Sequence, residues 1–251
     1  MFRLLTRGDD AGCALSANRA IHDAVTGGIL RNISCLAPGP EIAHAAEHLR
    51  DLKGVDFGLH SCLTSEWHTP LFHPVAPAEK VPALFDARGA FPQDNAKLHA
   101  AKVPTEQVVI EWQAQLDRLR SLGLDIAYCD AHMGVTWMYD YADALQDFAQ
   151  RNGILCRLDV AVLPKVEDAF DEFDHASRLL AQLKQAEPGG TYLDVGHPVY
   201  NDAEMHAFEG VYRSGEACGR DRDGQRLEFM REDVVTWVRN HNVTLIRYSE
   251  L

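Results

Sequence analysis

The sequence lacks several features that define common classes of protein. Basic residues are in the minority: 24 lysines and arginines stand against 37 aspartates and glutamates, so the net charge is −13. A chain with this charge repels nucleic-acid phosphates and anionic membranes unless it holds a basic patch, and no run of Lys and Arg indicates one. No stretch approaches about 18 continuous apolar residues. We therefore expect no nucleic-acid partner and no membrane partner.

Paired cysteines and a leader segment are also missing. The six cysteines stand at wide, irregular spacings without a C-x-x-C, mostly inside apolar, strand-like runs. In such runs a free cysteine behaves as a small hydrophobic residue. The opening MFRLLTRGDD contains no apolar segment of the kind that a secretory signal needs. These observations predict reduced thiols and a cytoplasmic location.

Apolar runs alternate with longer periodic segments along the whole chain. We expect strands over 2–7, 32–37, 55–63, 125–131, 154–158, 191–195 and 243–248. We expect helices over 16–25, 40–52, 104–123, 141–151, 175–185 and 231–240. This alternation favours parallel βαβ units in a single domain over 1–251, as a closed or nearly closed α/β barrel. A doubly wound open sheet is the alternative, although neither G-x-G-x-x-G nor G-x-x-x-x-G-K occurs to support it.

Two stretches break this rhythm. Residues 64–103 carry five prolines and no clear periodicity, and they follow the third expected strand. A long ordered loop in a compact domain is usually a lid or a binding loop. We therefore predict a loop or lid over 64–103. A second irregular stretch, 198–226, follows the sixth expected strand.

Ionisable side chains cluster at the carboxyl ends of the expected strands. They are Asp9, Asp10, His60, Asp130, His132 and His197. In parallel α/β folds the active site is built from these strand ends. Alone, an Asp pair after a strand is often a turn or a helix cap, and a single histidine is often structural. Together, the set predicts one site.

One carboxylate and two imidazoles can hold a divalent metal ion with open positions for water and substrate. We assign Asp10, His60 and His132 to this role, with zinc, magnesium, manganese or cobalt as the ion. Asp9 is then placed to take a proton from bound water, and His197 to protonate a leaving group. The set predicts metal-assisted hydrolysis.

Three alternatives remain open at this point. The bond cleaved could belong to an amide or to a phosphoester, since Arg7 and Arg157 lie near strand ends and could pair with an anion. The protein could instead bind its ligand without turnover. A cysteine-based enzyme that uses Cys62 is a distant third.

Five motifs in chain order, and the tail, resemble one family. They are R-G-D-D-A-G at 7–12, G-L-H-S-C-L-T at 58–64, L-F-D-A-R-G-A-F at 84–91, C-D-A-H at 129–132, V-G-H-P at 195–198 and the tail at 245–251. They resemble the YdjC-like carbohydrate (chitooligosaccharide) deacetylases, also called the ChbG family. Each motif alone is weak, but their common order over nearly the whole chain makes coincidence improbable.

The resemblance implies an irregular (β/α) barrel related to the polysaccharide deacetylases, and hydrolysis of N-acetyl groups on a small carbohydrate. It implies Asp10, His60 and His132 as metal ligands, Asp9 as the base and His197 as the acid. Asp130 and Arg157 are expected beside the ligands or the substrate. The family often forms dimers, so a homodimer is one option for the oligomeric state.

The chain departs from the family pattern around the ligands. Met133 and Gly134 stand where the family has Gln-His after the D-x-H motif. Ala11 replaces an aromatic residue, and Cys62 replaces an asparagine-like polar residue. The three expected ligands are kept while their surroundings have changed. The sequence therefore supports the chemistry better than the identity of the sugar.

Overall fold

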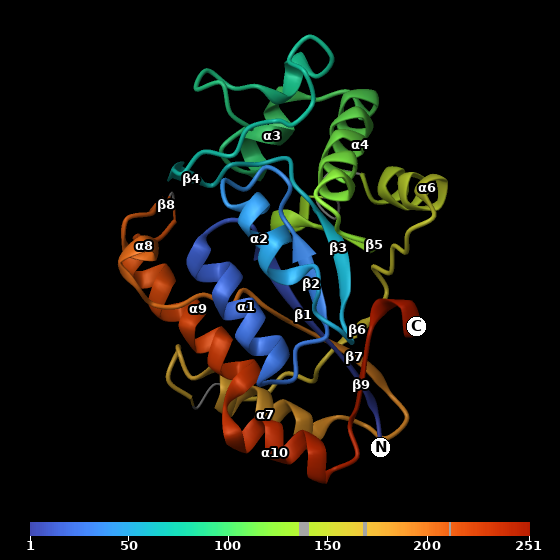
Figure 1. Ribbon diagram of the computed structural model, residues 1–251, viewed down its shortest axis with the longest axis vertical. Coiled ribbons are helices and arrows are strands. Elements are labelled where there is room, and N and C mark those ends of the chain that lie inside the picture. Colours follow the sequence, from blue (N-terminus) through green and yellow to red (C-terminus); the bar gives the residue numbers. More distant parts are fainter. Residues whose placement is uncertain (136–140, 168–169, 211) are drawn as a thin grey trace.

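The computed structural model describes residues 1–135, 141–167, 170–210 and 212–251. Its centre is a curled seven-stranded sheet (Figure 1). The strands are β1 (Arg3–Ala11), β2 (Asn32–Cys35), β3 (Asp56–Ser61), β5 (Ile126–Ala131), β6 (Ala161–Val162), β7 (Thr191–Gly196) and β9 (Thr244–Ile246). Their spatial order is β5-β3-β2-β1-β7-β6, with β9 beside the start of β1. All of these pairings are parallel, as the alternation predicts.

Helices flank this sheet. They are α1 (Leu15–Thr26), α2 (Ile42–Leu49), α3 (Asn95–Ala101), α4 (Thr105–Ser121), α6 (Ala142–Asn152), α7 (His175–Gln185), α8 (Ala203–His206), α9 (Gly215–Met230) and α10 (Glu232–Asn240). Helix α1 packs against α2 and α9, and α7 packs against α9 and α10 (Figure 1). No helix in the described part of the chain is long and apolar enough to cross a membrane.

Helix α4 shows how the sequence determines these elements. Val108, Trp112 and Leu116 recur every four residues and are fully buried, so one face of the helix enters the core. Pro104 precedes the first turn, where its missing N–H costs nothing. Gly123 follows the last turn with a φ of 85°, a left-handed conformation that glycine adopts without strain. Pattern, start and stop agree with the predicted helix.

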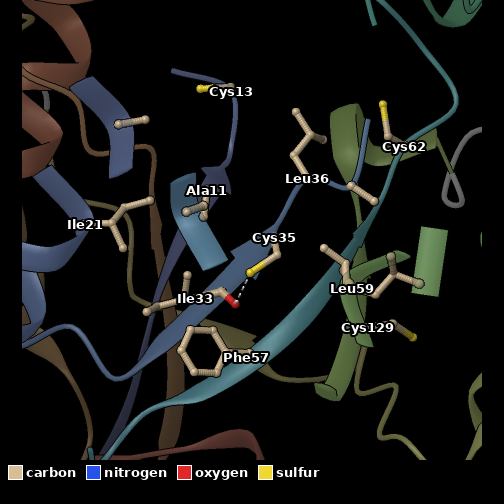
Figure 2. Packing of buried hydrophobic residues seen from close by; sticks show 14 of the residues in the cluster. Ala11, Cys13, Ile21, Ile33, Cys35, Leu36, Phe57, Leu59, Cys62 and Cys129 are labelled. Atoms are coloured by element: carbon tan, nitrogen blue, oxygen red, sulfur yellow. Dashed lines mark hydrogen bonds between the residues drawn. The ribbon is translucent and has the colours of Figure 1, made fainter. Parts of the chain in front are cut away.

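The buried core joins the sheet to its helices. In Figure 2 the side chains of Ile33, Phe57 and Leu59 follow one another along β2 and β3, and Ile21 comes from α1. Cys35 also belongs to this cluster, and its thiol contacts the carbonyl oxygen of Ile33 at 3.9 Å. The cysteines in the described residues are free thiols.

The predicted α/β barrel is confirmed in its irregular form, as a curled half-barrel. The expected strand 154–158 is reduced to a single bridge from Leu155 to Tyr128 of β5. The chain then crosses to β7, which it joins as β6. The gap between the two edges of the sheet is therefore crossed by the single segment 155–162, which pairs only briefly with β5 and with β7.

The stretch 64–103 is ordered and packed. It contains β4 (Trp67–Thr69), the short helix η1 (Pro82–Leu84) and α3. Phe72 and Phe91 are buried, and the carboxylate of Glu111 on α4 accepts hydrogen bonds from the backbone of Val75 and Ala76. Strand β4 pairs antiparallel with β8 (Glu209–Gly210), so this loop is joined to the loop after β7 (Figure 1).

The stretch 198–226 was expected to be irregular, and this expectation is wrong for its second half. Helix α9 begins at Gly215 and packs along α1, α7 and β7. Its sequence, GEACGRDRDGQRLEFM, lacks an amphipathic pattern because glycines fill close contacts where apolar side chains would stand. A Cβ on Gly224 would lie 2.3 Å from the carbonyl oxygen of Phe173. Helix α9 therefore follows from tertiary packing, which local propensity does not reveal.

Candidate metal centre

The end of β1 presents two neighbouring aspartates. Between Gly8 and Ala11, β1 advances three residues while β2 advances two, so one extra residue is inserted in the ladder. Asp10 has a φ of 64°, in the left-handed region that aspartate tolerates better than most residues. In a regular strand Asp9 and Asp10 would point to opposite faces, and a bulge changes that direction. Both side chains are buried at the carboxyl end of the sheet.

Three side chains from three strands form a compact triangle. The Oδ1 atom of Asp10 lies 3.4 Å from Nε2 of His60 and 3.2 Å from Nδ1 of His132. The two ring nitrogens are 3.2 Å apart. All three residues are at most 3% exposed. The parallel pairing of β3 with β5, which sets His60 opposite Asp130, places these segments side by side.

Each imidazole in the triangle has its other nitrogen bound to a carboxylate. His60 Nδ1 donates to Asp130, and His132 Nε2 donates to Glu66 over 3.0 Å. These bonds leave His60 Nε2 and His132 Nδ1 directed at Asp10. Carboxylates behind metal-bound histidines fix the tautomer and raise the basicity of the ligand.

Two arginines bind the same group of carboxylates. Arg222 of α9 donates to Asp10 Oδ2 over 2.8 Å, while Asp10 Oδ1 has no hydrogen-bond partner among the described residues. Arg7 binds both oxygens of Asp9, at 2.7 and 2.9 Å, and lies 3.4 Å from Asp130. The orphaned Oδ1 is the Asp10 atom in the triangle.

Burial and charge set the protonation of this cluster. Burial raises the pKa of Asp10, but Arg222 and the two histidines outweigh it and hold the pKa well below its usual value. Burial likewise opposes ionisation of Asp130, yet Arg7 and His60 lower its pKa to about 2. Burial lowers the pKa of His60, but Asp130 and Asp9 raise it to about 9.

His132 behaves in the same way. Burial lowers its pKa, while Glu66 and Asp10 outweigh burial and raise it to about 10. Without a metal ion, both histidines therefore hold an extra proton at neutral pH. This positive charge stands in the place where a cation would be expected.

The donor atoms fit a divalent ion. Neighbouring atoms bound to one ion at about 2.0–2.2 Å in a tetrahedral or octahedral shell lie about 2.8–3.6 Å apart. The three edges of the triangle, 3.2 to 3.4 Å, fall in that range. The surrounding carboxylates of Asp9, Asp10, Glu66 and Asp130 outnumber the two guanidinium groups by two, a charge that one divalent ion would neutralise. Asp9, His60 and Asp130 form a second close group, but there Arg7 already supplies the cation.

His197 lies beside the triangle, outside it. It follows the end of β7 and lines a pocket of about 270 Å³ together with Glu66, Trp67, Met133 and Arg222. Burial and the charge of Arg222 lower its pKa, against the opposing effect of Asp10 and Asp9. The structure thus brings five predicted residues into one cluster and His197 to its rim.

Arg157 is placed elsewhere. Its exposed guanidinium pairs with Asp159 over 2.9 Å. It shares the lining of a cavity of about 120 Å³ with Arg7 and Asp130, and this cavity has no lining residue in common with the pocket at His197. Its predicted contact with substrate stays a prediction.

Three further residues line the pocket at His197 and are not predicted from the sequence: Glu66, Arg222 and Gln225. Glu66 lies in the proline-rich stretch, two residues after the L-T of the G-L-H motif, and a carboxylate so close to a predicted ligand was the available signal. Arg222 and Gln225 lie on α9, which the sequence did not reveal. The thiol of Cys62 is buried and its pKa is raised well above the usual value by burial and Glu66, which disfavours a nucleophilic thiolate.

Comparison with known proteins gives consistent results over the full length. A family model described as YdjC-like protein matches residues 3–239. A carbohydrate deacetylase of Thermoanaerobacter pseudethanolicus is 26% identical, over 99% of this chain and 98% of that protein. A chitooligosaccharide deacetylase of Serratia marcescens is 25% identical, over 80% of this chain and 83% of that protein.

Solved structures share the fold. A crystal structure from Enterococcus faecalis, provisionally described as a cellobiose-phosphate cleavage protein, superposes with a TM-score of 0.80 at 19% identity, over 100% of this chain and 99% of that chain. A CE4 esterase of Streptococcus mutans gives a TM-score of 0.53 at 13% identity, over 98% and 85% of the two chains. The expected α/β fold is thereby confirmed.

Proposed function

We propose that this chain, which belongs to the YdjC-like protein family, is a metal-dependent hydrolase that removes N-acetyl groups from sugars or short oligosaccharides. Relatives named as carbohydrate deacetylases support the reaction class. One observation carries the metal dependence: Asp10 Oδ1, His60 Nε2 and His132 Nδ1 form a buried triangle with edges of 3.2 to 3.4 Å. We infer that these three atoms are the ligands.

A divalent ion in such a site lowers the pKa of a bound water and polarises a carbonyl group. The chain's own residues supply the rest. Asp9 Oδ2 lies 4.0 Å from His60 Nε2, one side chain away from the triangle, and is the group placed to accept the proton of the attacking water. Arg7 keeps the Asp9 carboxylate in position through two hydrogen bonds.

His197 is the group that we assign to the leaving amine. It approaches from β7, while the ligands come from the ends of β1, β3 and β5, so it faces the pocket from another side. Burial and Arg222 lower its pKa, which favours the neutral ring at rest. His197 therefore takes up a proton from solvent before it delivers one to the amine, and Asp9 returns the proton of the attacking water to solvent. The overall change adds water across the amide and gives acetate and a free amino group.

The pocket beside the triangle suits part of a small carbohydrate. Its volume of about 270 Å³ gives room for a single sugar unit rather than a long chain. Trp67 and Tyr212 provide aromatic surface, and Gln225 and Asp221 provide polar groups. Glu66 and Trp67 belong to the stretch 64–103, so we propose that this stretch forms a wall of the substrate site. The cytoplasmic location and a homodimer stay predictions from the sequence.

The direct test measures acetate released from a panel of N-acetylated mono- and oligosaccharides. Metal-stripped protein is compared with the same protein after addition of zinc, manganese, cobalt or magnesium. We expect release that needs one of these ions and that a chelator abolishes. Release that persists in stripped protein would contradict metal dependence. Bound metal with no release from any sugar would contradict the deacetylase assignment.

A further inference from the structure

The ring of His197 can transfer a proton to substrate only if the correct nitrogen faces the pocket. The proposed function requires that nitrogen to be free of other partners. His197 stands at the start of a loop, directly after Gly196 of β7, where the strand no longer fixes the side chain. Some other group must set the orientation of the ring and the nitrogen that carries its proton.

Gln225 of α9 makes that contact. Its Oε1 atom lies 2.7 Å from the backbone nitrogen of His197 and 3.0 Å from Nδ1 of the same residue. A backbone N–H can only donate, so the atom of Gln225 that meets it must be the amide oxygen. The same oxygen therefore accepts from Nδ1, and Nδ1 carries the proton.

Asp221, one turn earlier on α9, fixes the amide from its other end. Gln225 Nε2 donates to Asp221 Oδ2 over 3.1 Å. Burial raises the pKa of Asp221, but hydrogen bonding from His175 and the charge of Arg213 outweigh it and lower the pKa. The carboxylate can only accept, so the NH₂ group of Gln225 must face it. The amide is thus oriented at both ends.

We propose that Gln225 is a positioning residue that holds His197 as the Nδ1–H tautomer and presents Nε2 to the pocket. This inference rests on the proposed function only for its kinetic consequence; the tautomer follows from Asp221, Gln225 and the backbone of His197. The order of contacts is carboxylate, amide and imidazole. It sets the direction of proton transfer at His197 without adding a charge next to the ring.

Gln225 carries no charge, unlike the carboxylates that bind the two histidines of the proposed metal centre. The charged groups that face His197 are Arg222 from α9, and Asp9 and Asp10 from β1. Asp130 and Glu66 each place a negative charge behind His60 and His132. A neutral amide behind His197 fixes the ring as firmly but leaves it less basic. The proton donor and the ligands are thereby tuned differently.

The test compares Gln225→Leu with Gln225→Glu. The first removes the acceptor at nearly constant size, and the second keeps an oxygen for the same two donors. We expect Gln225→Leu to lower kcat about 10–100-fold with little change in KM or in bound metal. We expect Gln225→Glu to recover part of that loss, because the new carboxylate keeps the acceptor but repels Asp221, and to move the pH profile to higher pH. Gln113→Leu, a glutamine on α4 that binds Asp117, is the control and should leave kcat unchanged.

A spectroscopic measurement tests the tautomer independently of turnover. In protein labelled with ¹⁵N-histidine, with the signal assigned through His197→Gln, neutral His197 should show its proton on Nδ1. Gln225→Leu should remove this preference, and thermal unfolding should show that the variant is folded. A wild-type Nε2–H tautomer, or an unchanged kcat in a folded Gln225→Leu, would overturn the proposal. If wild-type protein releases no acetate, the proposed function fails while the tautomer still decides the role of Gln225.

Discussion

Two groups of acidic side chains, one at the ends of β1 and β5 and one between β7 and α9, differ in how their charge is balanced. In the first group, which surrounds the proposed metal centre, Asp10 and Asp130 contact arginines and histidines, and the pKa of each is lowered. Between β7 and α9, burial outweighs the opposing charge of His175 on Asp194 and of Arg178 on Glu228. Burial raises the pKa of Asp194 to about 7, against a small opposing effect of His175.

Glu228 completes the second pair. Burial and the nearby Asp194 raise its pKa well above the usual value, and Asp194 Oδ2 has no hydrogen-bond partner in the described structure. Burial of carboxylates alone therefore does not build a catalytic site. The first cluster keeps its charges because counter-charges and donors meet them, whereas the second group holds protons instead. The following predictions test this contrast.

The largest effect is expected at the base. Asp9→Asn keeps the shape of the side chain and a partner for Arg7, but removes the atom that accepts the proton of water. We expect turnover to fall about 10²–10⁴-fold while the metal stays bound. Acetate release and metal content are measured on the same sample. A variant that keeps the wild-type rate would show that Asp9 is not the base.

The free energy of unfolding of metal-free protein should fall as the pH rises into the alkaline range. The pKa values of His60 and His132 are raised to about 9 and about 10, above the unfolded value near 6.5. Their stabilising contribution is therefore complete below about pH 6.5 and is lost as pH rises through 9 to 10. Each proton corresponds to a slope of up to about 1.4 kcal/mol per pH unit in the free energy of unfolding. Urea unfolding at pH 6.5, 8 and 9.5 measures this slope. A flat profile for metal-free protein would contradict it, and bound metal should reduce it.

Glu66→Gln should weaken metal binding. The variant removes the negative charge behind His132 and makes this ligand less basic, so we expect about 10–100-fold lower affinity. Glu228→Gln is the matched control, because it changes an equally buried carboxylate in the group between β7 and α9. Titration calorimetry with zinc measures both. Equal affinities in the two variants would remove the distinction between the groups.

The smallest effect is expected for Asp194→Asn. Because the pKa of Asp194 is raised, the folded state holds a proton that the unfolded state releases above about pH 4. Wild-type stability should therefore decline between pH 4 and 7, and the variant should be the more stable protein at pH 8. At pH 4 the two proteins should unfold alike. A variant less stable than wild type at pH 8 would show that the ionised carboxylate is favoured there.

The sequence was sufficient to predict where the metal-candidate residues meet. Parallel strands place their carboxyl ends at one edge, so Asp10, His60 and His132 converge although they are far apart in the chain. The periodicity of α4 likewise predicted its buried face. These features depend on regular elements, whose geometry the local pattern determines.

The remaining parts of the site depend on tertiary contacts. Arg222 reaches Asp10 across 212 positions, and Glu66 reaches His132 across 66. Neither contact leaves a periodic signal, because Glu66 lies in a non-repetitive loop and α9 has glycines where an apolar stripe would normally appear. The bulge at Asp10 also depends on pairing with β2 rather than on its own residues alone. The supporting contacts were therefore found only in the folded structure.

The most direct test of the central claim is a calorimetric titration of metal-stripped protein with zinc at pH 7, in buffers of different ionisation enthalpy. We expect one ion to bind per chain, with nearly two protons released per ion, because His60 and His132 must lose their extra protons to bind it. Asp10→Ala, if folded, should bind far more weakly. Absence of binding to the wild-type chain, or unchanged binding to a folded Asp10→Ala, would contradict the claim that Asp10, His60 and His132 form the metal centre.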